Sequence, residues 1–127
     1  MSDRSGDVVV IGAGLIGLSI AFELAERGAC VRVYDRGEPA RAASWAGAGL
    51  LAPYTERITN QALLALCAAS LEEYPAYVAR VHDAGGIDAR LRREGVLYAA
   101  FDAAGLGALR EHARALLARG ITCELLD

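Results

Sequence analysis

The most regular pattern of apolar and polar positions lies in the first third of the chain. Residues 8–11 (VVVI) are four consecutive β-branched residues, which predicts a short strand buried on both faces. Residues 12–28 then carry apolar side chains at helical spacing and end at a glycine, a common helix terminator. Residues 30–36 (CVRVYDR) alternate again, which predicts a second, parallel strand that ends at Asp35. This order predicts an α/β fold that begins with a Rossmann-like βαβ unit.

The turn between the first strand and the helix has the glycine pattern GxGxxG. Gly12 permits a tight turn, Gly14 lets the main chain approach a diphosphate, and Gly17 lets the helix pack close to the strand. The diphosphate would lie at the helix N-terminus, where free N–H groups and the positive end of the helix dipole favour an anion. Asp35 can accept hydrogen bonds from both ribose hydroxyls and would repel a 2′-phosphate, which argues against NADP. The positive charge of Arg36 is a weaker argument in favour of NADP. The sequence therefore predicts a dinucleotide-binding site; the alternative is a glycine-rich turn without a ligand.

A second helix is predicted over residues 60–84. Pro75 should kink or restart this helix because it lacks a backbone N–H group. The sequence AGG at 84–86 marks the end of the helix. An apolar stripe runs along this predicted helix, and we interpret it mainly as core packing. The apolar stripe consists of Leu63, Cys67, Leu71, Tyr74, Tyr77, Val78 and Val81.

The end of the chain predicts a strand, a helix and a further short element. Residues 95–101 (GVLYAAF) alternate like a strand, residues 106–120 have helical spacing and end at a glycine, and residues 121–127 predict a short strand or turn. This order suggests a second structural layer that begins near Gly86. Two parallel strands do not complete a doubly wound sheet, so residues 1–85 would be only the N-terminal part of a dinucleotide-binding domain.

Composition and charge exclude several classes of partner. Hydrophobic residues make up 54% of the chain and the net charge is −3, which gives no electrostatic reason to expect binding to nucleic acid or an anionic membrane. The first apolar segment is interrupted by glycines and by Glu23, so it is too short and polar to span a membrane. The N-terminal MSDRSGD has two acids against one arginine, unlike a signal peptide. Cys30, Cys67 and Cys123 are widely spaced and odd in number, and we interpret them as reduced thiols of a cytoplasmic protein. The three cysteines match no metal spacing, and His82 and His112 are expected at the surface, so no metal site is expected.

The run ASWAGAGLLAP, residues 43–53, is rich in small residues. Such a run lets the main chain lie against a flat or charged group. Ser44 could bind a phosphate oxygen or cap a helix that begins at Trp45. An alanine-rich loop leading into a helix is the alternative. Together with VVVIGAGLIGLSIAFELAERG, this run resembles the glycine-oxidase branch of the D-amino-acid oxidase family, FAD-dependent amine oxidases that in this branch serve bacterial thiamine biosynthesis. SLEEYPAYV and GIDARLRREGVLYAAF are also similar to segments of this family.

The resemblance implies that residues 1–85 are the N-terminal part of an FAD-binding domain and that residues 86–127 begin an α+β substrate-binding domain. It also implies FAD as the cofactor and a set of residues that contact it. Residues of the first turn would bind the diphosphate, the end of the second strand would bind the adenosine ribose, and the small-residue run would follow the phosphates and the flavin. Relatives often carry methionine in place of Leu50, a change of similar volume. The implied FAD contacts are Gly12, Gly14, Leu15, Ile16 and Gly17, then Asp35 and Arg36, and then Ala43, Ser44, Ala48, Gly49 and Leu50.

The resemblance also implies an activity, the oxidative deamination of glycine or another small primary or secondary amine to a 2-oxo acid, ammonia and hydrogen peroxide. The family's substrate-binding residues would lie beyond Asp127, and no catalytic residue can be assigned within this chain. We therefore expect an N-terminal fragment or a truncated gene product that is inactive alone and retains FAD weakly or not at all. A D-amino-acid dehydrogenase, a sarcosine-oxidase-like enzyme, and a non-catalytic dinucleotide-binding remnant are the alternatives, and homo-oligomerisation of a full-length protein is left open.

Overall fold

The computed structural model describes residues 8–56 and 58–126, and the chain divides into two compact units, Met1–Leu50 and Leu51–Asp127. The segment MSDRSGD, in which we expect no signal peptide, and Asp127 lie outside the described residues. Within the described residues, no helix is both long enough and apolar enough to cross a membrane.

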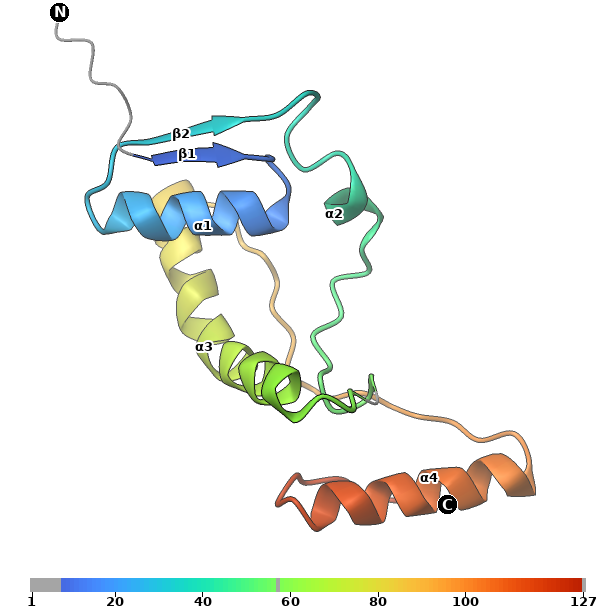
Figure 1. Cartoon of the computed structure of the whole chain (residues 1–127). Coiled ribbons are helices and arrows are strands. Elements are labelled where there is room, and N and C mark those ends of the chain that lie inside the picture. The colour runs from blue at the N-terminus through green and yellow to red at the C-terminus, as the bar shows by residue number, and fades with distance from the viewer. Residues whose placement is uncertain (1–7, 57, 127) are drawn as a thin grey trace, which may run out of the picture. The chain divides into compact units, whose positions relative to one another are not determined.

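The first unit contains the predicted βαβ arrangement. Strand β1 (Val8–Ile11) leads into helix α1 (Leu15–Glu26), which leads into strand β2 (Val31–Tyr34). The two strands are parallel, with Val8 opposite Val31, and Figure 1 shows α1 lying along one face of the strand pair. The helix ends where Gly28 adopts a φ of 88°, a left-handed conformation that glycine reaches without strain. The strand–helix–strand prediction is confirmed.

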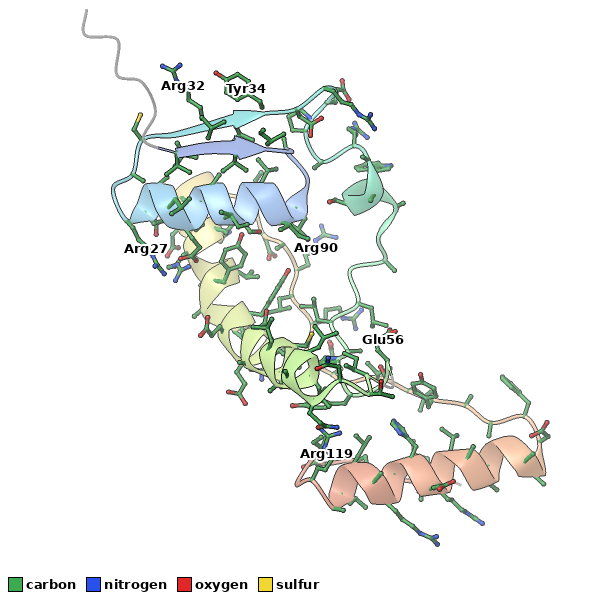
Figure 2. All side chains as sticks on the ribbon, viewed as in Figure 1. Arg27, Arg32, Tyr34, Glu56, Arg90 and Arg119 are labelled. Carbon is green, nitrogen blue, oxygen red and sulfur yellow. The ribbon has the colours of Figure 1, made fainter. Side chains whose placement is uncertain are left out.

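The prediction that the first strand is buried on both faces is wrong in this structure. Val10 lies on the α1 side, since a Cβ on Gly17 would lie 3.4 Å from its Cγ1 atom. On the opposite side, Val9 is 55% exposed and Ile11 is 89% exposed. Their register partners are Arg32 and Tyr34, which Figure 2 shows extending from β2 away from α1. Among the described residues of this unit, no element covers that face of the two-stranded sheet.

The chain after β2 forms a loop and a single helical turn, α2 (Ala43–Ala46), and continues without regular structure to Leu50. The buried positions of this unit are occupied by small residues, Ala13 at 4% and Ala21 at 9% exposure. Small side chains at these positions let α1 lie close to the strands, but they bury little apolar area and so contribute little hydrophobic stabilisation.

The second unit begins with one long helix, α3 (Gln61–Gly85). The side chain of Asn60 accepts a hydrogen bond from the Leu63 backbone N–H at 3.1 Å and caps the N-terminus. Pro75 lies inside the helix, and Figure 1 shows the helix axis bending part-way along its length, as the missing donor of proline predicts. The predicted apolar stripe is displaced by one position at its start, because Leu63 is 48% exposed whereas Leu64 is buried at 3%.

Two extended segments of the second unit are not strands. Residues 95–101 and 121–126 have no regular structure, so the predicted strand at 95–101 is wrong and no strand forms at 121–126. Alternating side chains form a strand only where a neighbouring strand pairs with the backbone, and the described part of this unit offers none. Helix α4 (Ala103–Leu117) is confirmed, but it starts before residue 106 because Asp102 accepts a hydrogen bond from the Gly105 N–H at 2.7 Å.

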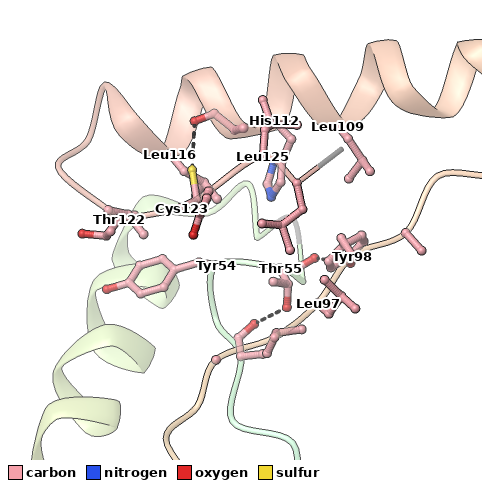
Figure 3. A pocket seen from close by; sticks show the side chains of 18 of the residues that line it. Tyr54, Thr55, Leu97, Tyr98, Leu109, His112, Leu116, Thr122, Cys123 and Leu125 are labelled. Atoms are coloured by element: carbon pink, nitrogen blue, oxygen red, sulfur yellow. Dashed lines mark hydrogen bonds between the residues drawn. The ribbon is translucent and has the colours of Figure 1, made fainter.

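A pocket of about 720 Å³ lies in the second unit, lined mostly by apolar side chains of residues 51–55, 95–100, α4 and 121–126. Figure 3 shows the Tyr98 hydroxyl donating to the Thr55 carbonyl at 2.9 Å across this pocket. His112 reaches into it from α4, and its buried Nε2 atom has no hydrogen-bond partner among the described residues. The surface placement expected for His112 is therefore wrong. Residues 12–50, which contain every residue predicted to bind the cofactor, do not line this pocket.

Candidate cofactor site

The turn after β1 takes the conformation that the glycine pattern predicts. Gly12 has a φ of 105°, which an L-amino acid with a side chain rarely adopts. Its N–H group donates to the Tyr34 carbonyl at 2.7 Å, so the turn begins directly at the carboxyl ends of both strands. This position is where dinucleotides bind in open parallel sheets.

Gly14 and Gly17 lie where side chains would meet close neighbours. A Cβ atom on Gly17 would clash with the carbonyl oxygen of Gly12, so only glycine permits this approach of α1 to the turn. A Cβ atom on Gly14 would lie 3.3 Å from the hydroxyl oxygen of Ser44. The absence of both side chains keeps the main chain exposed at the N-terminus of α1.

The first turn of α1 offers backbone donors to an anion. The N–H group of Leu15 donates to the Ser44 hydroxyl oxygen at 2.8 Å. Among the described residues, the N–H groups of Ile16 and Gly17 have no acceptor, and the first turn carries no acidic side chain. The positive end of the dipole of this 12-residue helix adds to the attraction for negative charge.

Ser44 does not cap the helix that was expected but contacts the N-terminus of α1. Helix α2 begins at Ala43 and has Ala42 as its N-cap, with no side-chain cap, so the prediction that Ser44 caps a helix starting at Trp45 is wrong. The single turn of α2 instead directs the Ser44 hydroxyl toward the N-terminus of α1. A hydroxyl there can accept from a backbone N–H and donate to a phosphate oxygen, because it has one proton and two lone pairs.

Asp35 follows β2 directly and accepts two backbone hydrogen bonds. Its Oδ2 atom accepts from the Ala13 N–H at 2.7 Å, and its Oδ1 atom accepts from the Gly37 N–H at 3.0 Å. These bonds, led by that of Ala13, hold the pKa of the exposed carboxyl below its ordinary value, and the backbone N–H and the charge of Arg36 are smaller causes in the same direction. Asp35 therefore stays ionised at neutral pH, and each oxygen keeps a lone pair for a further donor.

The remaining predicted positions follow α2 at the surface. Ala43 lies in α2, and Ala48, Gly49 and Leu50 lie in the irregular segment after it, all exposed. Gly49 has a φ of 71°, so a glycine is required to keep the backbone in this conformation without strain. The structure thus brings Ser44 and Asp35 to the glycine turn, whereas Ala48–Leu50 form no hydrogen bond with it.

Two alanines that the sequence did not single out contribute to this arrangement. The Ala13 carbonyl accepts from the Ala40 N–H at 2.7 Å, which joins the glycine turn to the loop after β2. Ala40 holds a φ of 58°, a left-handed conformation that is unusual for a residue with a side chain. The Ala13 position between two glycines was a weak indication in the sequence, but no pattern indicated Ala40.

The chemistry of these groups fits the diphosphate and ribose of a dinucleotide. Backbone donors without acceptors and a serine hydroxyl lie at one end of α1, and an ionised carboxylate lies at the neighbouring strand end. The glycines leave room at the same point, since added side chains there would meet the turn or Ser44.

Comparisons with known proteins identify a family and individual proteins that are similar to this chain. Residues 7–127 match the family model described as FAD dependent oxidoreductase. Glycine oxidase from Pseudomonas aeruginosa is 40% identical over 118 residues, which cover 91% of this chain and 32% of that protein. The bifunctional protein ThiO/ThiG from Trichormus variabilis is 46% identical over 82 residues, 65% of this chain and 12% of that protein.

The crystal structure of glycine oxidase from Geobacillus kaustophilus is similar to this chain with a TM-score of 0.84 and 31% sequence identity. The match covers 91% of this chain and 31% of that protein. The chain therefore spans about a third of the length of these glycine oxidases.

Proposed function

Because the chain belongs to the family of FAD-dependent oxidoreductases, we propose that it binds FAD and forms the N-terminal, cofactor-binding part of an amine oxidase that resembles glycine oxidase. One observation carries the proposal: the Ser44 hydroxyl and the Asp35 carboxylate, which come from different segments, both contact the backbone of the glycine turn beside the open N–H groups of α1. The first two groups suit a diphosphate, and the carboxylate suits a ribose with free hydroxyls.

The proposed reaction is the oxidation of glycine or another small primary or secondary amine. When bound, FAD would supply the redox chemistry, a two-electron oxidation of the amine in which dioxygen is the final electron acceptor and is reduced to hydrogen peroxide. Water would hydrolyse the imine product to a 2-oxo acid and ammonia, or to a 2-oxo acid and a primary amine when the substrate is a secondary amine. No residue of this chain is assigned to a proton transfer in this reaction.

In this proposal the residues of the chain bind and orient the cofactor. The N–H groups of Ile16 and Gly17 donate to the diphosphate, and the Ser44 hydroxyl donates to a phosphate oxygen. The Asp35 carboxylate accepts hydrogen bonds from the ribose hydroxyls, and the neighbouring Arg36 also contacts the ribose. The backbone of Gly12, Gly14 and Leu15 shapes the turn, and the exposed run of Ala43, Ala48, Gly49 and Leu50 contacts the phosphates and the flavin.

The wider assignments are proposals as well. A role in thiamine biosynthesis is supported by the similarity to proteins named ThiO/ThiG. A cytoplasmic location is a further part of the proposal. A domain boundary after residue 85 remains a proposal. A D-amino-acid dehydrogenase or a sarcosine-oxidase-like flavoenzyme is the second candidate from the same chemistry, and a non-catalytic dinucleotide-binding remnant is the third.

A titration followed by backbone amide NMR tests cofactor binding without requiring tight retention. FAD is expected to shift the amide signals of Ile16 and Gly17, and FMN, which lacks the second phosphate and the ribose, is expected to shift them less at equal concentration. NADP⁺ is expected to bind more weakly than NAD⁺ because its 2′-phosphate would meet the Asp35 carboxylate. FAD that shifts none of these signals would contradict the proposal.

A chimera separates an oxidase part from a non-catalytic remnant. In it, this chain replaces the matched N-terminal third of the Pseudomonas aeruginosa glycine oxidase. We expect a folded chimera that binds FAD and releases hydrogen peroxide from glycine, while the 127-residue chain alone releases none. A chimera that folds but binds no FAD favours the remnant, and peroxide from the chain alone would contradict the expectation that it is inactive.

A further inference from the structure

We propose that Asp35 is a positioning residue that holds the glycine turn in its diphosphate-binding conformation before any cofactor binds. The inference rests on the proposed FAD site but adds a second role to a residue otherwise expected only to contact ribose. The role would be to fix, through Ala13, the backbone donors that receive the phosphates.

The backbone of Ala13 joins the glycine turn to two positions in the chain after β2. Its N–H group donates to the Asp35 Oδ2 atom at 2.7 Å, and its carbonyl accepts from the Ala40 N–H at 2.7 Å. Ala13 itself is only 4% exposed, so water does not readily replace these bonds. The Asp35 Oδ1 atom accepts from Gly37 at 3.0 Å, which fixes the orientation of the carboxylate.

The turn needs such an anchor because glycines flank Ala13 on both sides. Gly12 and Gly14 have more accessible backbone conformations than other residues, and ordering them is entropically unfavourable. A hydrogen bond to an ionised acceptor is stronger than one between neutral groups. Ala40 keeps a left-handed φ of 58° while bonded to Ala13, which indicates that the surrounding contacts outweigh its local strain.

The positioning role and the ribose role can coexist on one carboxylate. Each Asp35 oxygen accepts one backbone N–H group and has a second lone pair for a ribose hydroxyl. The two roles differ in what they predict for an anion without ribose. As a charge alone, Asp35 repels phosphate, so its neutralisation would strengthen the binding of inorganic diphosphate. As an anchor of the turn, its neutralisation would weaken that binding.

The test measures inorganic diphosphate binding to the full chain through the amide shifts of Leu15, Ile16 and Gly17. We expect Asp35→Asn to raise the dissociation constant about tenfold, because an asparagine has one acceptor oxygen and cannot accept from both Ala13 and Gly37. Asp35→Glu, which keeps both carboxylate acceptors, is expected to recover most of the affinity.

The matched control is Glu38→Gln, which removes the same charge three residues away. The Glu38 side chain is 80% exposed and pairs with Arg41 at 3.5 Å. This variant is expected to bind diphosphate as well as the unchanged chain or slightly better. An Asp35→Asn variant that binds diphosphate as tightly as Glu38→Gln would overturn the proposal.

A further measurement on the unchanged chain does not depend on the folding of any variant. Without cofactor, the Ala13 amide is expected to exchange with solvent at least about tenfold more slowly than in an unstructured peptide. Exchange at the unstructured rate would overturn the proposal even if Asp35→Asn fails to fold. A chain that binds diphosphate in this manner but not FAD would contradict the proposed function and leave the role of Asp35 intact.

Discussion

At the scale of single residues, α1 begins very close to the backbone of the turn that precedes it. Gly17 faces the carbonyl oxygen of Gly12, and no side chain fits between them. Larger groups at such positions force backbone shifts rather than filling space. The distance between the helix N-terminus and the turn, and with it the geometry offered to a diphosphate, is therefore set by the absence of one methyl group.

Gly17→Ala is expected to destabilise the first unit by about 1–3 kcal/mol and to abolish the amide shifts caused by FAD, because the new Cβ displaces α1 from the turn. Hydrogen exchange of the α1 amides and an FAD titration measure the two effects. The control is Gly37→Ala in the same unit, where an added Cβ meets nothing within 4 Å. Equal effects of the two substitutions would show that steric contact at Gly17 is not the cause.

The hydrogen bonds to Asp35 predict a pH dependence. Because the folded chain holds the Asp35 pKa below its ordinary value of 3.8, the carboxylate stabilises the turn at pH values above 3.8. This contribution is lost as the pH falls through the lowered pKa of the folded state. The amide proton shifts of Ala13 and Gly37 are expected to titrate together with a midpoint below 3.8, and Asp35→Asn should remove the transition. A midpoint at or above 3.8 would show that the two bonds do not stabilise the ionised form.

At the scale of elements, the helices of the second unit begin at side-chain caps. Asn60 caps α3 and Asp102 caps α4, each through a side-chain oxygen that accepts the backbone N–H three residues on. The caps explain why both helices have definite starts although few of their residues are buried. In α3 the cap and a left-handed Gly86 define the two ends, and Pro75 bends the helix between them.

Asp102→Ala is expected to reduce the stability of the first turns of α4 by about 1 kcal/mol, because the Gly105 N–H loses its acceptor. Hydrogen exchange of the α4 amides measures this change residue by residue. Asp102→Asn keeps a side-chain oxygen as acceptor and is expected to retain most of the protection. If the two variants lose equal protection, the negative charge near the helix N-terminus rather than the hydrogen bond is the main contribution.

At the scale of the whole molecule, the described part of the first unit has a sheet of only two strands. Both strands are edge strands, and the face opposite α1 carries Val9 and Ile11 largely exposed. Unpaired strand edges and exposed apolar side chains favour pairing with another chain. The 127-residue chain by itself is therefore expected to self-associate as its concentration rises.

Ile11→Thr is expected to reduce this self-association, because it removes apolar surface from a side chain that is 89% exposed and keeps a β-branched residue in the strand. Sedimentation velocity at several concentrations measures the change. The control is Ile87→Thr, at an isoleucine that is 73% exposed outside any helix or strand. A similar reduction in both variants would mean that apolar exposure in general, not the open strand face, drives association.

The sequence by itself determined the local structure of the first unit and the family. The run of β-branched residues, the three glycines and the acid after the second strand act over a few neighbouring residues, so their pattern was sufficient to predict β1, α1, β2 and the turn. The same holds for α3 and α4, whose helical spacing and end signals are local. Asp35 and Ser44 could be selected as site residues because residue type and order are visible in a sequence.

Only the tertiary structure decided which groups those residues meet. The bond from Leu15 to Ser44 spans 29 positions and that from Ala13 to Asp35 spans 22, distances at which local pattern carries no information. Residues 95–101 alternate like a strand yet remain unpaired, because a strand exists only through hydrogen bonds to a neighbour that its own sequence does not specify. For the same reason β1, although uniformly apolar, is covered on one face only: burial depends on what packs against a residue, and hydrophobicity alone does not supply the partner.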